Sequence, residues 1–517
     1  MNHDRTQAHL GSGERARGAA GPAAGALAAL RAPWRVRARL RAGRRRLVAL
    51  LGPEFVARAA WFDRAVVLAF AVLTGLAVVG FTLLAEVASQ AHASLRSELP
   101  FGPYAALLWT PVLTVAVLWL TRRFAPGAFG SGIPQVVRAA DDDLLPSQRR
   151  WLVSPRVALA KIGLVSGGLL AGLSIGREGP TVQVGAGLMV GARRWLSARS
   201  RIDPHDLMVA GAAAGIAAAF NTPLGGIVFG LEQLTRRRNL EHSTLVISVI
   251  VLAGLVAVAV FGNETYFGRL RVQTLPLSLW WPGLLVALAC GLAGGLFAKL
   301  LILSAQRLPD RFSRWRLSHP YRFAAGCALA VAVIGLVTGG QTSGAGYAPT
   351  RAMLEGQSDL PGVYTLLKFC ATWLSAWTGV PAGVFAPSLA IGAGIGHDVA
   401  TLAEVGQQAA IPLIALGMVG FLAATTQTPI TAFIIVMEMV AGHSMVLSLM
   451  ACSMVAAGVS RLVTPPLYRE LAMLLPLPSP PAGSEAPAPT AGPAAAAPPG
   501  AGSAAHAQPR QQREDER

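Results

Sequence analysis

Long apolar runs separated by short polar stretches dominate the pattern of hydrophobic and polar positions along the chain. Ionised side chains are almost absent from residues 65–85, 103–121, 162–175, 207–231, 243–262, 283–298, 323–338 and 409–437. Several of these runs reach the roughly 20 residues that a helix needs to cross a hydrocarbon core of about 30 Å. The pattern therefore predicts an all-α, polytopic membrane protein.

Glycine and proline interrupt this pattern in three motifs. They are Gly130-Ser131-Gly132-Ile133-Pro134, Gly176-Arg177-Glu178-Gly179-Pro180 and Gly383-Val384-Phe385-Ala386-Pro387. Each proline occupies what would be the first turn of a helix, where its missing N–H is not needed. The glycines let the backbone turn sharply and come close to a ligand. We expect each motif to begin a half-helix inside the membrane.

Two pairs of segments indicate an internal repeat. Residues 211–234 match 417–440, with Glu232 against Glu438, and residues 176–187 match 383–394. The two pairs are collinear, with offsets of 206 and 207 residues. Duplicated membrane folds bind their substrate between the repeats, at discontinuous helices near the midplane. We predict a transmembrane domain at 64–475, with repeats at about 64–240 and 275–472 whose half-helices meet at the midplane.

Composition adds most at the two ends of the chain. Only 14% of the residues are charged, compared with about 25% in soluble domains. Eight arginines and no acid lie between Arg31 and Arg46. The positive-inside rule makes residues 1–63 a cytoplasmic arm in preference to a nucleic-acid-binding one. Residues 476–517 are mostly Pro, Ala and Gly, a composition that does not form a packed core, so we predict a disordered tail.

Arginine supplies most of the formal net charge of +18, and its clusters lie between apolar runs, at 122–123, 193–201, 236–238 and 307–316. We interpret these clusters as cytoplasmic loop ends, so both termini are predicted to be cytoplasmic. The four cysteines are widely spaced and indicate neither a disulfide framework nor a metal site. No cofactor is predicted.

The three motifs together are suited to binding an anion. A helix N-terminus offers unpaired N–H groups and roughly half a positive charge, which can replace the water shell of an anion without holding it too tightly to move. The candidate anion ligands are therefore the Ser131 hydroxyl and the helix-start residues Gly132, Ile133, Arg177 and Gly179. Glu178 is the only acid within the motifs. An intramembrane carboxylate indicates function, and we predict that Glu178 occupies the anion site until a proton or a competing ion displaces it.

These motifs carry a resemblance to the CLC family of chloride channels and chloride/proton antiporters. They reproduce the three family signatures in order, and the resemblance extends over roughly residues 65–472. It implies an inverted-repeat fold and a homodimer with one chloride pathway per subunit. It also implies that the hydroxyls of Ser131 and Tyr468 and the backbone N–H groups of Val384 and Phe385 bind the central chloride, with Glu178 as the external gate. We expect a bacterial-type member without CBS domains, in the inner membrane.

The chain departs from the antiporters of that family at one position. Their internal proton-transferring glutamate directly follows the residue that matches Glu232, and this chain has Gln233 there. An amide does not titrate. We therefore expect a voltage- or pH-gated chloride channel, with chloride/proton exchange through Glu178 as the alternative. Gln135 and Val137 likewise replace acids that are common after the first signature.

Two other classes of protein are weaker interpretations. An intramembrane hydrolase would need Ser131 or Ser174 within hydrogen-bond reach of a base such as His397 or His443, and no histidine adjoins the motifs in the sequence. A cation/proton carrier would need several acids around the broken helices, where Glu178 stands alone. We predict a transport protein and not an enzyme.

Overall fold

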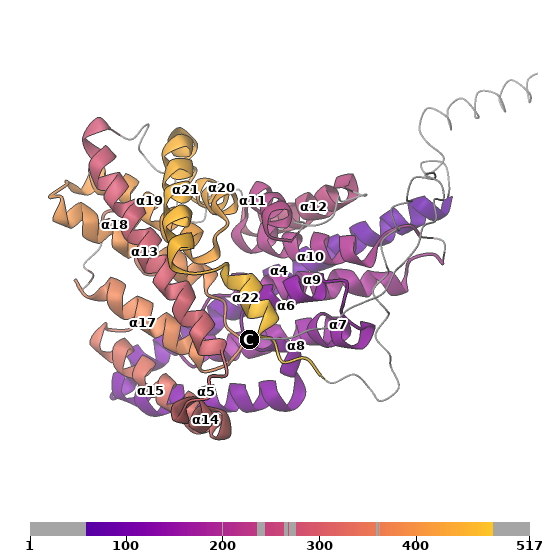
Figure 1. The fold of residues 1–517 in the computed structure, drawn as a ribbon, viewed down its shortest axis with the longest axis horizontal. Helices are drawn as coiled ribbons and strands as arrows, with labels where there is room; N and C mark the ends of the chain where they lie inside the picture. Colours follow the sequence, from indigo (N-terminus) through magenta and orange to yellow (C-terminus); the bar gives the residue numbers. More distant parts are fainter. Residues whose placement is uncertain are drawn as a thin grey trace, which may run out of the picture.

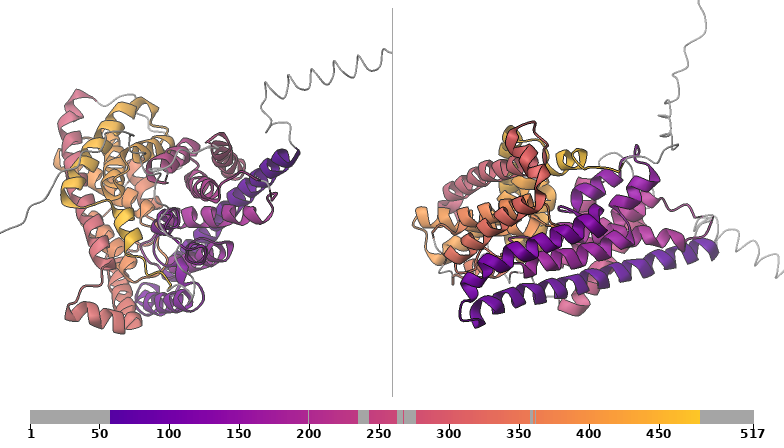
Figure 2. Two further views of the ribbon diagram at one scale, coloured as in Figure 1. Left: turned by 45° about the vertical axis from the view of Figure 1, so that its right-hand side comes forward. Right: turned by 90° about the horizontal axis from the view of Figure 1, so that it is seen from below.

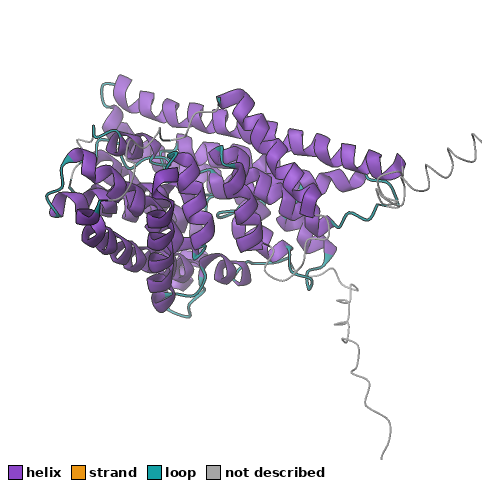
Figure 3. Ribbon diagram, turned by 90° about the horizontal axis from the view of Figure 1, so that it is seen from above, coloured by secondary structure: helices purple, strands orange, loops and turns teal. Residues whose placement is uncertain are grey.

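The structure, a computed structural model, describes residues 58–198, 200–234, 243–262, 267, 276–357, 360 and 362–478. These residues are almost entirely helical, and Figure 3 shows helices joined by loops, with no strand in the part drawn in colour. Within these ranges, eight helices are long and apolar enough to cross a membrane, which confirms the predicted all-α polytopic class. The arm up to residue 57, the arginine cluster at 236–238 and the tail beyond Pro478 lie outside the described residues.

The first half of the chain contains nine of the described α-helices. They are α4 (Arg58–Glu98), α5 (Gly102–Phe124), α6 (Ile133–Ala139), α7 (Pro146–Leu152), α8 (Pro155–Leu170), α9 (Glu178–Gly191), α10 (Pro204–Phe220), α11 (Pro223–Phe229) and α12 (Ser243–Phe261). Short turns of other helix types are η1 (Pro126–Ala128), η2 (Ala192–Arg194) and the π-helical η3 (Gly230–Leu234).

The second half runs from η4 (Leu277–Leu279) to the last described helix. Its α-helices are α13 (Trp280–Ala305), α14 (Arg311–Ser318), α15 (Pro320–Val337), α16 (Tyr347–Leu354), α17 (Tyr364–Trp377), α18 (Phe385–Leu402), α19 (Gln407–Thr426), α20 (Pro429–Met439), α21 (Val446–Val463) and α22 (Leu467–Met473), with η5 (His443–Met445) before α21.

The two halves meet along the middle of the molecule. In Figure 1 most of the first-half helices, from indigo to magenta, lie to the right and below, and most of the second-half helices, from orange to yellow, lie to the left. At the boundary α11 packs on α20 and α22 packs on α6. Figure 2 shows the long helices α4 and α5 running side by side along one edge. The half-helices that begin at the three motifs therefore lie in the interior, between the halves.

Two of the longest apolar runs do not form single helices. Residues 207–231 divide into α10 and α11, and residues 409–437 divide into α19 and α20. Both breaks have a residue in the left-handed conformation, Asn221 with φ 57° and Gln427 with φ 55°, followed by Thr-Pro. A left-handed residue closes the first helix, and proline in the first turn starts the second one. Because the breaks fall at matching positions of the repeat, they support the inverted-repeat architecture.

Close glycine crossings also occur in both halves. Gly185 of α9 crosses Gly211 of α10, and Gly392 of α18 crosses Gly417 of α19. A Cβ atom on any of these glycines would lie between 2.1 and 2.3 Å from the backbone oxygen of the opposing glycine. Small residues let membrane helices approach closely. These crossings fix α9 and α18, whose N-termini form the candidate site.

Glu232 and Glu438 link the two halves reciprocally. The Glu232 carboxylate accepts hydrogen bonds from the Thr431 N–H at 2.7 Å and the Ile430 N–H at 3.3 Å, at the start of α20. The Glu438 carboxylate accepts from the Gly225 N–H at 2.8 Å and the Leu224 N–H at 3.3 Å, at the start of α11. Each glutamate therefore caps the first turn of a half-helix in the other half of the chain.

The first described helix begins before residue 64, where the transmembrane domain is predicted to start, and that domain boundary stays a prediction. Helix α4 begins at Arg58, and Asp63 is only 4% exposed. Its carboxylate accepts hydrogen bonds from the Ser197 N–H at 2.7 Å and the Ser197 hydroxyl at 2.8 Å. The first turns of α4 therefore pack on the loop that follows η2.

Candidate anion site

The three glycine- and proline-containing motifs are hydrogen-bonded to one another. The Gly176 N–H donates to the Gly383 carbonyl at 2.7 Å, and the Gly383 N–H donates to the Gly176 carbonyl at 3.0 Å. The Ala382 N–H donates to the Gly130 carbonyl at 3.2 Å and connects the first motif to this pair. The N-termini of α6, α9 and α18 are thus gathered in one region, as the sequence predicted.

Two hydroxyl groups in this region have no hydrogen-bond partner. The side-chain oxygens of Ser131 and Tyr468 are buried and unpaired, and both residues line one cavity together with Val384. A Cβ atom on Gly179 would lie 2.5 Å from Ser131 Oγ and 3.6 Å from Gly383 Cα, so this hydroxyl faces the joined ends of α9 and α18. Leaving a buried donor unpaired costs about 1–3 kcal/mol. An anion that accepts from both hydroxyls would recover that free energy.

Helices α9 and α18 present their first turns to the same region. Val384 is the N-cap of α18, and Arg177 is the N-cap of α9. Val384 and Phe385 are 5% and 1% exposed. The first N–H groups of a helix have no acceptor within it, so these buried donors can receive an anion.

The first motif offers fewer donors than its sequence suggests. The Gly132 N–H already donates to Gln135 Oε1 at 2.9 Å, and the Gln135 amide nitrogen donates in turn to the Phe129 carbonyl. The Gly132 N–H is therefore paired within its own motif in this structure, and its role as an anion ligand stays a prediction. Ile133, the first residue of α6, is 0% exposed, and its place in the site stays a prediction.

Glu178 is completely buried at the start of α9. Its Oε1 accepts a hydrogen bond from the Tyr347 hydroxyl and lies 4.0 Å from Arg177 Nε, whereas its Oε2 has no partner. The Arg177 guanidinium turns toward Glu86 of α4, at 3.4 Å, and lies 5.5 Å from the centre of the Tyr347 ring. Glu178 is thus held mainly by a tyrosine and not by its neighbouring arginine.

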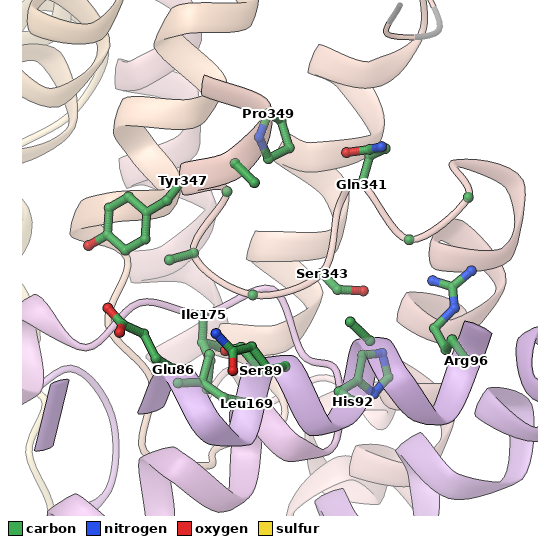
Figure 4. A pocket seen from close by; sticks show the side chains of 18 of the residues that line it. Glu86, Ser89, His92, Arg96, Leu169, Ile175, Gln341, Ser343, Tyr347 and Pro349 are labelled. Carbon is green, nitrogen blue, oxygen red and sulfur yellow. The ribbon is translucent and has the colours of Figure 1, made fainter. Parts of the chain in front are cut away.

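Two cavities approach this region from different directions. The Tyr347 cavity, of about 640 Å³, lies between α4 and the loop before α16, and Arg177 and Tyr347 are among the residues that line it. Figure 4 shows this cavity, with Glu86 and Arg96 on α4 and Tyr347 across from them. The Tyr468 cavity, of about 580 Å³, is lined by Ser131, Val384 and Tyr468. Glu178 itself lines neither cavity, but Arg177 and Tyr347, which contact its carboxylate, both line the Tyr347 cavity.

Two buried lysines shape the region, and the sequence did not show which groups they contact. Lys161 of α8 is fully buried, and its ammonium group donates to the carbonyls of Ala128 at 2.7 Å and Gly130 at 2.6 Å. The ammonium group of Lys368, on α17, likewise donates to the carbonyls of Thr342 at 2.9 Å and Gly344 at 2.8 Å, in the loop before Tyr347. Each lysine orders a loop next to Glu178 or Ser131. A lysine within an apolar run was the available clue, but its partners lie on distant segments.

The hydroxyls proposed for a hydrolase lack a base among the described residues. Ser131 Oγ has no partner, and Ser174 Oγ pairs with the Thr372 hydroxyl at 2.9 Å. His397 instead lies 3.9 Å from Asp398. Gln233, in η3, also has a buried side-chain oxygen without a partner and lines neither the Tyr347 cavity nor the Tyr468 cavity.

Comparison with known proteins decides the family. The model of the family described as "Voltage gated chloride channel" matches residues 113–461, which include all three motifs. The chain belongs to this family. Among curated members it is 30% identical over 433 residues to the "H(+)/Cl(-) exchange transporter ClcA" of Vibrio parahaemolyticus, a match that covers 78% of this chain and 89% of that protein. It is also 30% identical to the Citrobacter koseri protein of the same name, over 73% of this chain and 82% of that one.

Solved structures of other family members share the fold. A slow cyanobacterial Cl⁻/H⁺ antiporter superposes with a TM-score of 0.68 at 23% identity, over 80% of this chain and 97% of that one. A CLC-type fluoride/proton antiporter gives a TM-score of 0.64 at 23% identity, over 78% of this chain and 95% of that one. These comparisons confirm the predicted CLC architecture.

Proposed function

We propose that this protein exchanges chloride for protons across a bacterial inner membrane and that Glu178 takes part in both movements. As a carboxylate, Glu178 occupies the region where the half-helix N-termini meet and excludes chloride from it. When it accepts a proton, it loses its charge and the same donors become available to chloride. The movement of one side chain then couples the two ions.

The complete burial of Glu178 beside the joined half-helix N-termini is the observation that carries this proposal. We infer that this carboxylate, which has no exposed surface, separates the two cavities and can meet ions from either side only one step at a time. The unpaired hydroxyls of Ser131 and Tyr468 and the first N–H groups of α9 and α18 would bind the chloride. These ligands carry no full positive charge, so chloride can leave again.

The names of the relatives favour exchange over the gated channel that Gln233 suggests. The similar curated proteins from Vibrio parahaemolyticus and Citrobacter koseri are called H⁺/Cl⁻ exchange transporters. With Gln233, exchange requires that protons reach Glu178 without a carboxylate at that position. We therefore expect Gln233→Leu to leave the ratio of protons to chloride unchanged.

Reversal potentials under combined chloride and proton gradients test the proposal. A pure chloride conductance reverses at the chloride equilibrium potential, about 59 mV for a tenfold gradient, whatever the pH difference. For an exchanger, the reversal potential shifts when a pH gradient is added. We expect that shift in the parent protein and its loss in Glu178→Gln. A parent reversal potential that ignores the pH gradient would show a channel.

Charge supports an orientation for the two cavities. The Tyr468 cavity is lined by Arg122, Arg307 and Arg316, and the positive-inside rule places such loops in the cytoplasm. The Tyr347 cavity then opens to the outside, so Glu178 is an external gate. Cysteines introduced at Arg307 and at Gln341 should react from opposite sides of the membrane with an impermeant reagent.

The apolar face around the reciprocal caps fits a homodimer. Leu224, Leu255, Ile430 and Leu447 are 55%, 54%, 41% and 75% exposed, on the contacting helices α11, α12, α20 and α21. An apolar face formed by helices of both repeats suits a symmetric contact between two copies of the chain. Light scattering in detergent should give twice the mass of one chain.

A further inference from the structure

Tyr347 contacts Glu178 from the side of the Tyr347 cavity. It is the first residue of α16, and it lines the Tyr347 cavity. Its hydroxyl donates a hydrogen bond to Glu178 Oε1. Figure 4 shows the ring at the same end of the cavity as Glu86. Tyr468 lines the other cavity, so of these two tyrosines it is Tyr347 that makes the hydrogen bond to Glu178.

The Tyr347 ring is fixed before it meets the carboxylate. The Arg177 guanidinium lies 5.5 Å from its centre, a cation–π distance, and the Phe267 ring is 5.9 Å away. Arg177 is held in turn by Glu86 at 3.4 Å. Behind the ring, Lys368 orders the loop that leads into α16. These contacts orient the ring so that its hydroxyl meets Glu178.

We propose that Tyr347 is a positioning residue that holds the ionised Glu178 carboxylate in its closed position. This inference rests on the proposed gating by Glu178 and deepens it. A hydroxyl donor binds a charged acceptor more strongly than a neutral one, so the hydrogen bond favours the ionised, closed gate. Protonation of Glu178 weakens the bond and frees the side chain. Tyr347 therefore sets how much acid is needed to open the path.

The other charged groups around Glu178 do not replace this bond. Arg177 Nε is 4.0 Å from Oε1, which is too far for a hydrogen bond, and Glu86 acts only through Arg177. Lys161 of α8 points to the carbonyls of residues 128–130. From α18, Ala386 and Pro387 contribute apolar atoms beside Gly176, next to Glu178 Oε2.

Tyr347→Phe tests the proposal because it removes the hydroxyl and keeps the ring against Arg177 and Phe267. In proteoliposomes, we expect the pH of half-maximal chloride flux to rise by about one unit, since losing a hydrogen bond to a charged group changes the proton affinity roughly tenfold. Tyr364→Phe is the matched control, because the Tyr364 hydroxyl is buried and has no partner. That control should keep the parental profile. A Tyr347→Phe midpoint equal to the parent's overturns the proposal.

The Glu178→Gln background separates a positioning role from a structural one. There the carboxylate is absent, so adding Tyr347→Phe should change the flux no further. If it does, Tyr347 acts through packing, and the proposal fails. If Glu178→Gln itself keeps the parental pH dependence, the proposed function fails. A flat Glu178→Gln profile together with an unshifted Tyr347→Phe profile would overturn the role of Tyr347 alone.

Discussion

The Gly179→Ala variant tests whether the joined half-helices bind chloride. The new methyl carbon would lie 2.5 Å from Ser131 Oγ and 3.1 Å from the Ser131 carbonyl oxygen. Real Cβ atoms do not approach an oxygen as closely as 2.5 Å, so the hydroxyl must rotate away or the two motifs must separate. The contact with the Ser131 carbonyl oxygen is also tight, whereas Gly383 Cα, 3.6 Å away, is at an ordinary contact distance. In either case the site loses the Ser131 donor.

The size of the effect follows from the donor that is lost. A hydrogen bond to a charged partner contributes about 1.5–3 kcal/mol, and each 1.4 kcal/mol changes an affinity about tenfold. Loss of the Ser131 hydroxyl should therefore weaken chloride binding by roughly one to two orders of magnitude. Alanine also favours a helix more than glycine does, so α9 itself should still form.

Calorimetric titration of the purified protein with chloride measures this affinity directly. Gly163→Ala, in the middle of α8, is the matched control, because nothing lies within 4 Å of its new Cβ atom. We expect the control to bind as the parent does. If Gly179→Ala binds chloride with the parental affinity, Ser131 and the first turn of α9 do not form the anion site.

Three further outcomes are expected. Glu178→Gln should make chloride flux independent of pH, because an amide cannot be protonated in this range, and a liposome assay with flux that still rises in acid would contradict this gating role. Gly417→Ala should lower the free energy of unfolding in detergent by about 1–3 kcal/mol through overpacking, since its Cβ would lie 2.1 Å from the Gly392 oxygen. Gly458→Ala is the control, because its Cβ meets nothing within 4 Å, and it should melt at the parental temperature. Glu438→Gln should weaken the cap on α11 and lower the melting temperature, because it removes the charge from two backbone hydrogen bonds; an unchanged melting temperature would mean that the cap does not stabilise the contact between the halves.

The three motifs could be found in the sequence because the features that define them are local. Proline in a first turn and glycine beside it determine where a helix can start, whatever packs around it. The duplicated Thr-Pro positions also mark the breaks before α11 and α20, although the apolar runs that contain them look continuous. Hydrophobicity alone does not show a break, because both sides of it are buried.

The partners of the polar groups could not be found in this way. Tyr347 meets Glu178 across 169 residues of sequence, and Lys161 reaches carbonyls 31 to 33 residues away. Gln135 accepts from the Gly132 N–H a hydrogen bond that depends on the turn between them.

The sequence by itself determined that this chain spans a membrane, that it is duplicated and that Glu178 stands at a helix start, since each follows from composition or from neighbouring residues. Only the tertiary structure decided which donors face the carboxylate and which are already paired. That choice depends on how helices from both halves pack, and a buried polar group takes whichever partner the packing brings within about 3 Å.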